Sequence, residues 1–126
     1  MKSKLYVLED VFTIHRFPPD NEIPIWLFDG PFCHITKTVD EISVICSASV
    51  QLNSTKSETG WSCIKVLGPL DLNLTGLLAD VLMVLAKVNI SIIALSTYDT
   101  DYILVKSEKI NNAIQALRQA EYPFEQ

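Results

Sequence analysis

Apolar and polar positions follow clear periods in the second half of the chain. A run rich in β-forming residues ends at Gly68-Pro69, and it is followed by apolar residues at helical spacing and then by a segment rich in β-branched side chains. The expected elements are a strand at 61–67, a helix at 74–88, strands at 90–97 and 102–105 around a turn, and a helix capped by Ser107 with its stripe ending at Ala120. Residues 121–126 are a candidate last edge strand. The order is therefore β-α-β-β-α.

The first half repeats this plan in a degenerate form. Its expected elements are a strand at 11–17, a single helical turn at 23–28, a hairpin of 32–38 with 42–49, and a polar loop or linker at 51–59. This pattern predicts an α+β fold of two tandem ferredoxin-like (βαββαβ) units, with antiparallel sheets covered by helices on one face. We expect the units at residues 1–59 and 60–126, with Gly60 at their junction.

Composition and charge exclude several functional classes. The chain has 126 residues, 48% of them hydrophobic, so it can bury a core. Its net charge of −5 repels phosphate backbones, so nucleic acid is not an expected partner. The first ten residues lack the apolar core of a signal peptide, and polar residues interrupt the longest apolar stretch, at 74–95. We therefore expect a cytoplasmic protein that does not enter a membrane.

The cysteines and histidines indicate no metal and no cofactor. Cys33, Cys46 and Cys63 are odd in number and too far apart for a CxxC pair. Adding His15 or His34 does not complete a metal site, because Cys33 and His34 are neighbours in a strand and point to opposite faces. Buried reduced thiols and core or edge histidines are the simpler interpretation.

The stretch from Gly68 to Gly76, which leads into the first turn of the predicted helix, is a candidate ligand site. The N-terminus of a helix presents free N–H groups and a positive dipole end, which favour an anion such as an α-carboxylate. The candidate ligand residues here are Asp71, Leu74, Thr75 and Gly76. Thr75 offers a hydroxyl donor, and Gly76 allows close approach to the backbone. Asp71 could bind a ligand ammonium, or it could simply cap the helix.

A family resemblance rests on the segment LTGLLADVLMVLAKVNISIIALSTYDTDYILVKSEKINNAIQAL, and on FCHITKTVDEISVICS in the first half. Both segments resemble the small ACT-domain proteins related to the regulatory region of aspartate kinase, and the animal cytosolic arginine sensors of the mTOR pathway. The resemblance implies a tandem pair of ACT units that binds an amino acid at an interface between units, without chemistry. It also implies a homodimer, which would supply two such pairs.

The same resemblance places Thr97, Tyr98 and Asp101 in the ligand pocket. An acidic group at Asp101 could neutralise an α-ammonium or a basic side chain. Asp99 and Asp101 could instead stabilise the turn, and Tyr98 could simply cover the edge of the core. Residue types do not name the amino acid or the protein that is regulated.

Two rival functions remain. A strand followed by Asp99-Thr-Asp101 imitates the start of a Mg²⁺-dependent phosphohydrolase, but the chain is too short for the doubly wound sheet of those enzymes. No Ser-His-Asp arrangement is convincing, so no catalytic residue is assigned. The second rival is an interaction or dimerisation module, in which the apolar surplus of helix 74–88 contacts a protein and no ligand binds.

Overall fold

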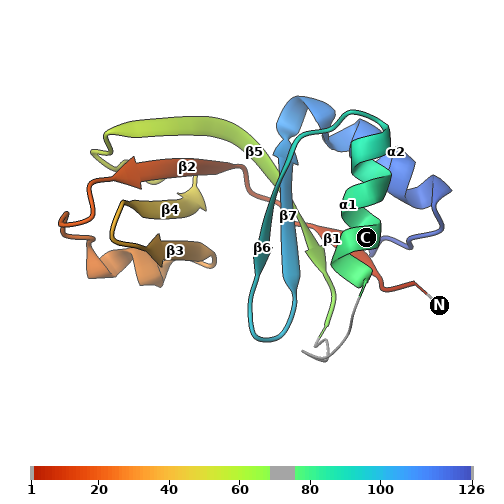
Figure 1. The fold of residues 1–126 in the computed structure, drawn as a ribbon, viewed down its shortest axis with the longest axis horizontal. Helices are drawn as coiled ribbons and strands as arrows, with labels where there is room; N and C mark the ends of the chain where they lie inside the picture. Colours follow the sequence, from red (N-terminus) through yellow and green to blue (C-terminus); the bar gives the residue numbers. More distant parts are fainter. Residues whose placement is uncertain (1, 69–75, 126) are drawn as a thin grey trace. The chain divides into compact units, whose positions relative to one another are not determined.

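The computed structural model describes residues 2–68 and 76–125, and their contacts divide the chain into two compact units. Unit 1 combines Met1–Glu9 with Trp61–Gln126, and unit 2 is Asp10–Gly60. The elements in chain order are β1 (Leu5–Val7), β2 (Phe12–Phe17), the 3₁₀ helix η1 (Ile25–Asp29), β3 (Cys33–Lys37), β4 (Ile42–Ser47), β5 (Lys56–Val66), α1 (Leu77–Lys87), β6 (Ile92–Ser96), β7 (Asp101–Lys106), the 3₁₀ helix η2 (Ser107–Lys109) and α2 (Ile110–Gln119) (Figure 1).

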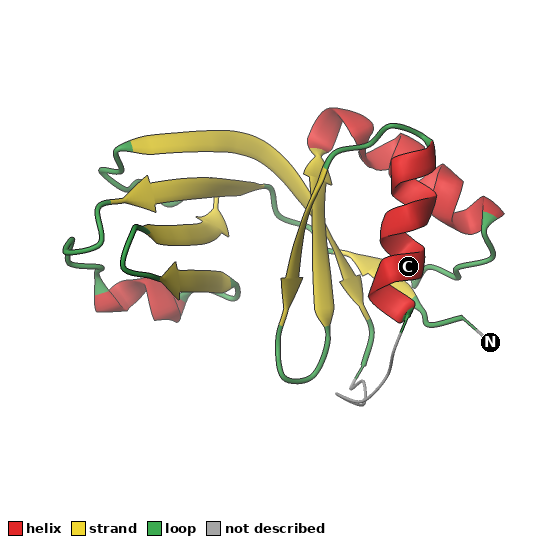
Figure 2. Ribbon diagram, in the orientation of Figure 1, coloured by secondary structure: helices red, strands yellow, loops and turns green. Residues whose placement is uncertain are grey.

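Unit 1 is an antiparallel sheet with two helices on one face (Figure 2). Its strands lie in the order β1-β5-β7-β6. Alternate residues of β5 and β7 face the helices, because side chains of a strand alternate between the two faces of the sheet. The fully buried centre of this core contains Ile64, Val66, Val81, Leu85, Ile103, Val105 and Leu117. The predicted α+β class, with antiparallel strands covered by helices, is confirmed for this unit.

The N-terminal residues supply a strand that the sequence pattern did not predict. β1 is only three residues long, and it pairs with the end of β5 through Leu5 opposite Val66. On its other side, Leu5 forms a parallel bridge to Phe124, with Leu5 N–H donating to Pro123 O at 2.8 Å. Within the described residues 121–125, the predicted edge strand is present as this bridge, and β1 occupies the position beside β5.

Unit 2 is a four-stranded arrangement in the order β3-β4-β2-β5. The expected hairpin is confirmed, since β3 and β4 pair antiparallel, and the expected helical turn is η1. One face of the sheet packs on Leu27 of η1, together with Phe17, Ile42, Val44 and Cys46. Only a 3₁₀ turn covers this sheet among the described helical elements, so a second complete βαββαβ unit stays a prediction.

The polar segment at 51–59 is partly a strand, which corrects the predicted loop. β5 begins at Lys56 and continues through Gly60 for 11 residues. Backbone pairing with β2 holds its first part, and a backbone ladder does not require apolar side chains. The division at 59/60 stays a prediction, whereas the contacts group residues 1–9 with the second half of the chain.

Side-chain caps are absent at the starts of η2 and α2. The prediction that Ser107 caps the closing helix is therefore wrong, and the Ser107 hydroxyl instead forms a hydrogen bond with Ser62 Oγ at 2.8 Å. α1 begins at Leu77 and ends at Lys87. Beyond its end, Asn89 takes a left-handed conformation, and Ile90 N–H donates to Leu85 O. This is the usual way for a helix to satisfy its last carbonyls.

Gly60 gives a direct test of the backbone of β5. Its φ is +83°, and a Cβ added there would meet no atom within 4 Å. Gly60→Ala should therefore destabilise the protein by about 1–2 kcal/mol through conformation alone. Urea unfolding measures this difference. Gly30→Ala is the control, because the φ of Gly30 is −78° and the added Cβ would lie 3.9 Å from Leu27 O. Equal effects of the two substitutions would contradict the assignment.

Candidate functional site

The turn between β6 and β7 is closed by a small network of threonine hydrogen bonds. Thr97 N–H donates to Thr100 O at 2.8 Å, and Thr97 Oγ1 donates to the same oxygen at 3.1 Å. The Thr100 N–H in turn donates to Thr97 Oγ1 at 3.3 Å. These bonds fix the backbone of the predicted ligand turn.

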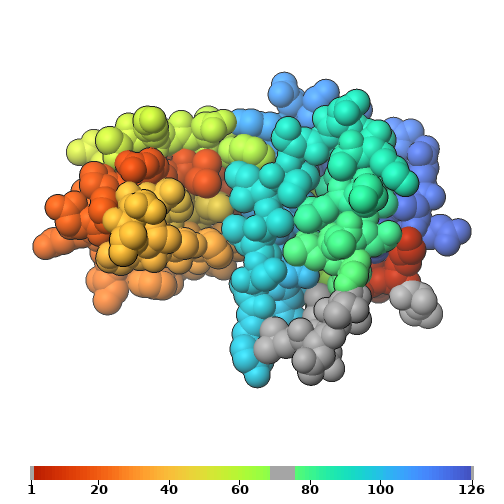
Figure 3. Space-filling model, viewed as in Figure 1, coloured from red at the N-terminus to blue at the C-terminus, as the bar shows by residue number. Residues whose placement is uncertain are grey.

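A buried hydroxyl fixes this turn to the end of β5. Thr100 is 6% exposed, and its Oγ1 donates to Val66 O, the last residue of β5. The turn therefore lies at the end of unit 1 where β5 finishes. The start of α1 is at this end as well (Figure 1), and both α1 and the β6–β7 hairpin reach the surface there (Figure 3).

Asp101 and Tyr98 differ in how firmly they are held. Asp101 is half-buried, and its Oδ1 accepts a hydrogen bond from Ser96 Oγ at 2.6 Å. Tyr98 is 80% exposed, so it does not cover the core of unit 1. Thr97 and Asp99 are exposed too. The turn thus presents one positioned carboxylate and an exposed aromatic ring.

Gly76 marks the start of α1. It precedes Leu77 in a left-handed conformation with φ +84°, and Asp80 N–H donates to Gly76 O at 2.9 Å. The predicted ligand residues Asp71, Leu74 and Thr75 lie outside the described residues. The structure therefore brings Gly76, Thr97, Tyr98 and Asp101 to one end of unit 1. The roles of Asp71, Leu74 and Thr75 stay predictions.

A cluster around Asp80 was not predicted from the sequence. Asp80, in the first turn of α1, accepts hydrogen bonds from Tyr122 Oη and from Lys2 Nζ, the latter at 3.4 Å. The bond from Tyr122 and the positive charge of Lys2 lower the pKa of Asp80. Burial and the Asp80 carboxylate raise the pKa of Tyr122. These three residues are far apart in the sequence, and no local pattern relates them.

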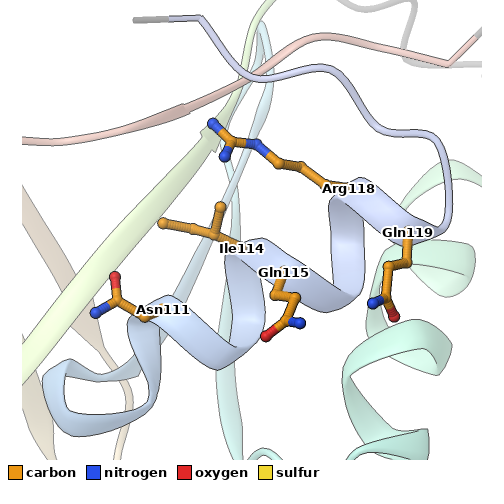
Figure 4. A pocket seen from close by; sticks show the side chains of 5 residues that line it. All are labelled: Asn111, Ile114, Gln115, Arg118 and Gln119. Atoms are coloured by element: carbon orange, nitrogen blue, oxygen red, sulfur yellow. The ribbon is translucent and has the colours of Figure 1, made fainter.

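Shallow depressions occur elsewhere in the described chain. One of about 480 Å³ lies along α2, lined by Asn111, Ile114, Gln115, Arg118 and Gln119 (Figure 4). In unit 2, a depression of about 540 Å³ is lined by Glu41 and by residues of β2, β4 and β5 that include Arg16, Ser43 and Lys56. Neither depression includes a predicted ligand residue, and both are open to solvent.

Both histidines and all three cysteines lie in strands. His15 is 6% exposed, its Nδ1 lies 2.9 Å from Ser54 Oγ, and burial lowers its pKa. Cys33, Cys46 and Cys63 are free thiols. No cluster of three or more His, Cys, Asp or Glu side chains suited to a metal ion occurs within residues 2–68 and 76–125. Within the same residues, no helix is long and apolar enough to cross a membrane.

Comparison with known proteins identifies the family of this fold. A family model described as an ACT domain matches residues 56–119, which contain β5, both helices and the β6–β7 turn. The chain belongs to the ACT-domain family. A second model, described only as an N-terminal domain, matches residues 10–50. The resemblance recognised in the sequence is confirmed, and ACT domains are regulatory, ligand-binding modules.

Solved structures show the same fold at several levels of identity. A crystal structure of a protein from Agobacterium tumefaciens is 31% identical, with a TM-score of 0.90, and the match covers 99% of this chain and 93% of that one. A protein of unknown function from Vibrio cholerae, titled a possible transport protein, is 21% identical with a TM-score of 0.71 over 92% of this chain and 88% of that one. A search of curated proteins finds no match.

Aspartate kinases share the fold at lower identity. Escherichia coli aspartokinase III, in complex with aspartate and ADP, is 15% identical with a TM-score of 0.64. The match covers 91% of this chain but only 32% of that chain. The present chain therefore resembles one part of that enzyme.

The Asp80 cluster predicts a pH-dependent contribution to stability. Tyr122→Phe should destabilise the protein at neutral pH because Asp80 loses its hydrogen-bond donor. The folded state lowers the pKa of Asp80, so the stabilisation is present above the unfolded pKa of about 3.9 and is lost as pH falls through the folded pKa. Urea unfolding of both proteins between neutral and acid pH measures this. In an Asp80→Asn background, Tyr122→Phe should have a pH-independent effect. An unchanged pH dependence in that background would contradict the assignment.

Proposed function

We propose that this ACT-domain protein is a regulatory module that binds an amino acid between the start of α1 and the β6–β7 turn. The observation that carries the proposal is the bond from Thr100 to Val66, which holds the turn at the same end of unit 1 as the start of the helix. Asp101 then provides a positioned carboxylate for the ligand ammonium. The crystal structure of aspartokinase III in complex with aspartate and ADP, whose fold is partly shared, supports this ligand class.

The opposite end of the ligand would meet the N-terminus of α1. The first N–H groups of a helix have no acceptor within it, and they favour a carboxylate. Gly76 has no side chain with which to cap α1, so the N-cap residue itself does not occupy these donors. The negative charge of Asp80 in the same turn is offset by Lys2, whose Nζ lies 3.4 Å from Asp80 Oδ2, which leaves the helix end favourable for an anion.

The proposal includes a homodimer in the cytoplasm, with the site completed at an interface between ACT units of two chains. Exposed apolar or small residues recur on α1 at Ala79, Met83 and Ala86, and the spacing places them on one face. Met83 is 56% exposed. No bond-making chemistry is proposed for Asp99 or Asp101.

The ligand proposal predicts a selective thermal shift. Among the common amino acids, one or a few should raise the melting temperature, because a ligand at 100 times its Kd stabilises by about 2.7 kcal/mol. Differential scanning fluorimetry identifies them, and isothermal titration calorimetry measures the affinity. Asp101→Asn should weaken binding at least about tenfold, since it removes a charge-assisted hydrogen bond.

Asp99→Asn is the matched control. Asp99 has the same charge in the same turn but is exposed, so its loss should leave the affinity nearly unchanged. Equal losses from both substitutions would show that only the overall charge of the turn matters. The absence of a shift with every amino acid would reject the ligand class.

The dimer proposal predicts a mass of twice 14.1 kDa in size-exclusion chromatography with light scattering. Met83→Lys should shift the population toward monomer, because it puts a charge on the apolar stripe of α1. Gln115→Lys, at an exposed position of α2, is the control with the same added charge. A wild-type monomer at all concentrations would contradict the proposal.

A second candidate function, a protein interaction module, is favoured by a different surface. Ile25, Trp26 and Phe28 of η1 are 83%, 50% and 68% exposed, so a short helix in unit 2 presents three large apolar side chains to solvent. Exposed apolar groups of this size are typical of contact surfaces. This function gains support if no amino acid binds.

A further inference from the structure

Two of the three cysteines face each other across neighbouring strands of unit 2. The register of β3 with β4 places Cys33 directly opposite Cys46. Residues that lie directly opposite in an antiparallel pair project from the same face of the sheet. Both side chains also belong to the same apolar cluster, around Phe17 and Leu27. The spacing of the cysteines along the chain does not reveal this pairing.

The hydrogen-bond pattern shows which kind of pair this is. In an antiparallel ladder, hydrogen-bonded and non-hydrogen-bonded pairs alternate. Thr38 N–H donates to Glu41 O, which makes that opposing pair a hydrogen-bonded one in the same register. Counting back five positions along β3 from Thr38 reaches Cys33, so the Cys33–Cys46 pair is of the non-hydrogen-bonded kind.

The pairing of β4 with β2, its other neighbour, independently indicates that Cys33 and Cys46 form a non-hydrogen-bonded pair. Ala48 N–H donates to Val11 O, and in that register Thr13 and Cys46 also form a hydrogen-bonded pair. The peptide groups of Cys46 therefore point toward β2 and away from β3. Cys46 therefore meets Cys33 on β3 through its side chain and not through a backbone hydrogen bond.

The geometry of this pair suits a disulfide. Cα atoms of non-hydrogen-bonded pairs lie about 4.5 Å apart, with side chains closer than in the hydrogen-bonded kind. That distance is within the window of about 4.4–6.8 Å that disulfides require. Burial and the neighbouring Cys33 charge raise the pKa of Cys46 to about 11, which agrees with thiols in close proximity. Cys33 is partly exposed, so a small reagent can reach one member of the pair.

We propose that Cys33 and Cys46 form a reversible intramolecular disulfide when the protein meets a low-molecular-weight disulfide such as oxidised glutathione. This is a modification site in unit 2, separate from the ligand site proposed in unit 1. Cys63 lies in unit 1, is completely buried and has no such partner across the strands that pair with it, where it faces Leu104.

The reaction proceeds in two exchange steps. The Cys33 thiolate attacks one sulfur of oxidised glutathione, which forms a mixed disulfide and releases one glutathione thiolate. Cys46 loses its proton and attacks Cys33 Sγ, which forms the Cys33–Cys46 bond and releases the second glutathione. Two protein thiols are oxidised and one glutathione disulfide is reduced to two thiols. Burial raises the pKa of Cys33 too, so the rate should increase toward alkaline pH.

Oxidation of the native protein with glutathione disulfide, followed by acid quenching and intact mass spectrometry, tests the site. The expected product has lost two hydrogens and carries no glutathione. Trypsin cuts after Arg16, Lys37 and Lys56, so the expected crosslink joins peptides 17–37 and 38–56. Dithiothreitol should restore the original mass.

Matched variants separate this pair from general thiol reactivity. Cys63→Ser should leave the product unchanged, whereas Cys46→Ser should retain one glutathione on Cys33 and form no internal crosslink. The same oxidation in urea should give mixed pairings that include Cys63, because proximity is then lost. A native protein that stops at the glutathione adduct, stays reduced, or crosslinks through Cys63 would overturn the proposal.

Discussion

The backbone pairing of β5 is the constraint on which the rest of the structure depends. This strand belongs to both units. Its residues up to Gly60 are part of unit 2, where β5 is hydrogen-bonded to β2, and its residues from Trp61 to Lys65 pair with β7 in unit 1. The short β1 adds to its last residues and brings the N-terminal segment into unit 1. A one-residue slip of β5 would move every core side chain, including Ile64 and Val66, to the opposite face. The register of β5 is therefore fixed because its core side chains are buried against both helices.

The candidate ligand site inherits its position from the end of the same strand. Val66 O accepts the hydroxyl of Thr100, and Leu67 N–H donates to Lys4 O at 2.9 Å, so the last residues of β5 are held from two sides. Hydrogen bonds between Thr97 and Thr100 fix the β6–β7 turn itself. A ligand that bridges this turn and the start of α1 would meet groups already in place, and such preorganisation reduces the entropy lost on binding.

The sequence was informative where the deciding interactions are local. The apolar period of α1, the β-branched run of β6 and the hairpin of β3 and β4 all follow from neighbours within a few residues. β1 could not be predicted, because a three-residue strand is stable only through its distant partner Val66. Lys56–Thr59 looked like a loop because their side chains are polar, whereas their pairing uses only the backbone. Ser107 was misassigned because its hydroxyl bonds to Ser62, 45 residues away.

The same distinction applies to the chemistry. The turn of Thr97 to Asp101 is a local feature, and both the residue types and the family resemblance pointed to it. The bond of Tyr122 to Asp80 joins residues 42 positions apart, and the pairing of Cys33 with Cys46 depends on a register that only the folded hairpin defines. A single tyrosine, aspartate or cysteine in a sequence does not indicate which distant residue it will contact. Function at such places arises when a nonlocal register puts two reactive groups within reach, and for that reason the thiol pair emerges from the hydrogen-bond pattern of β4 and not from the spacing of its cysteines.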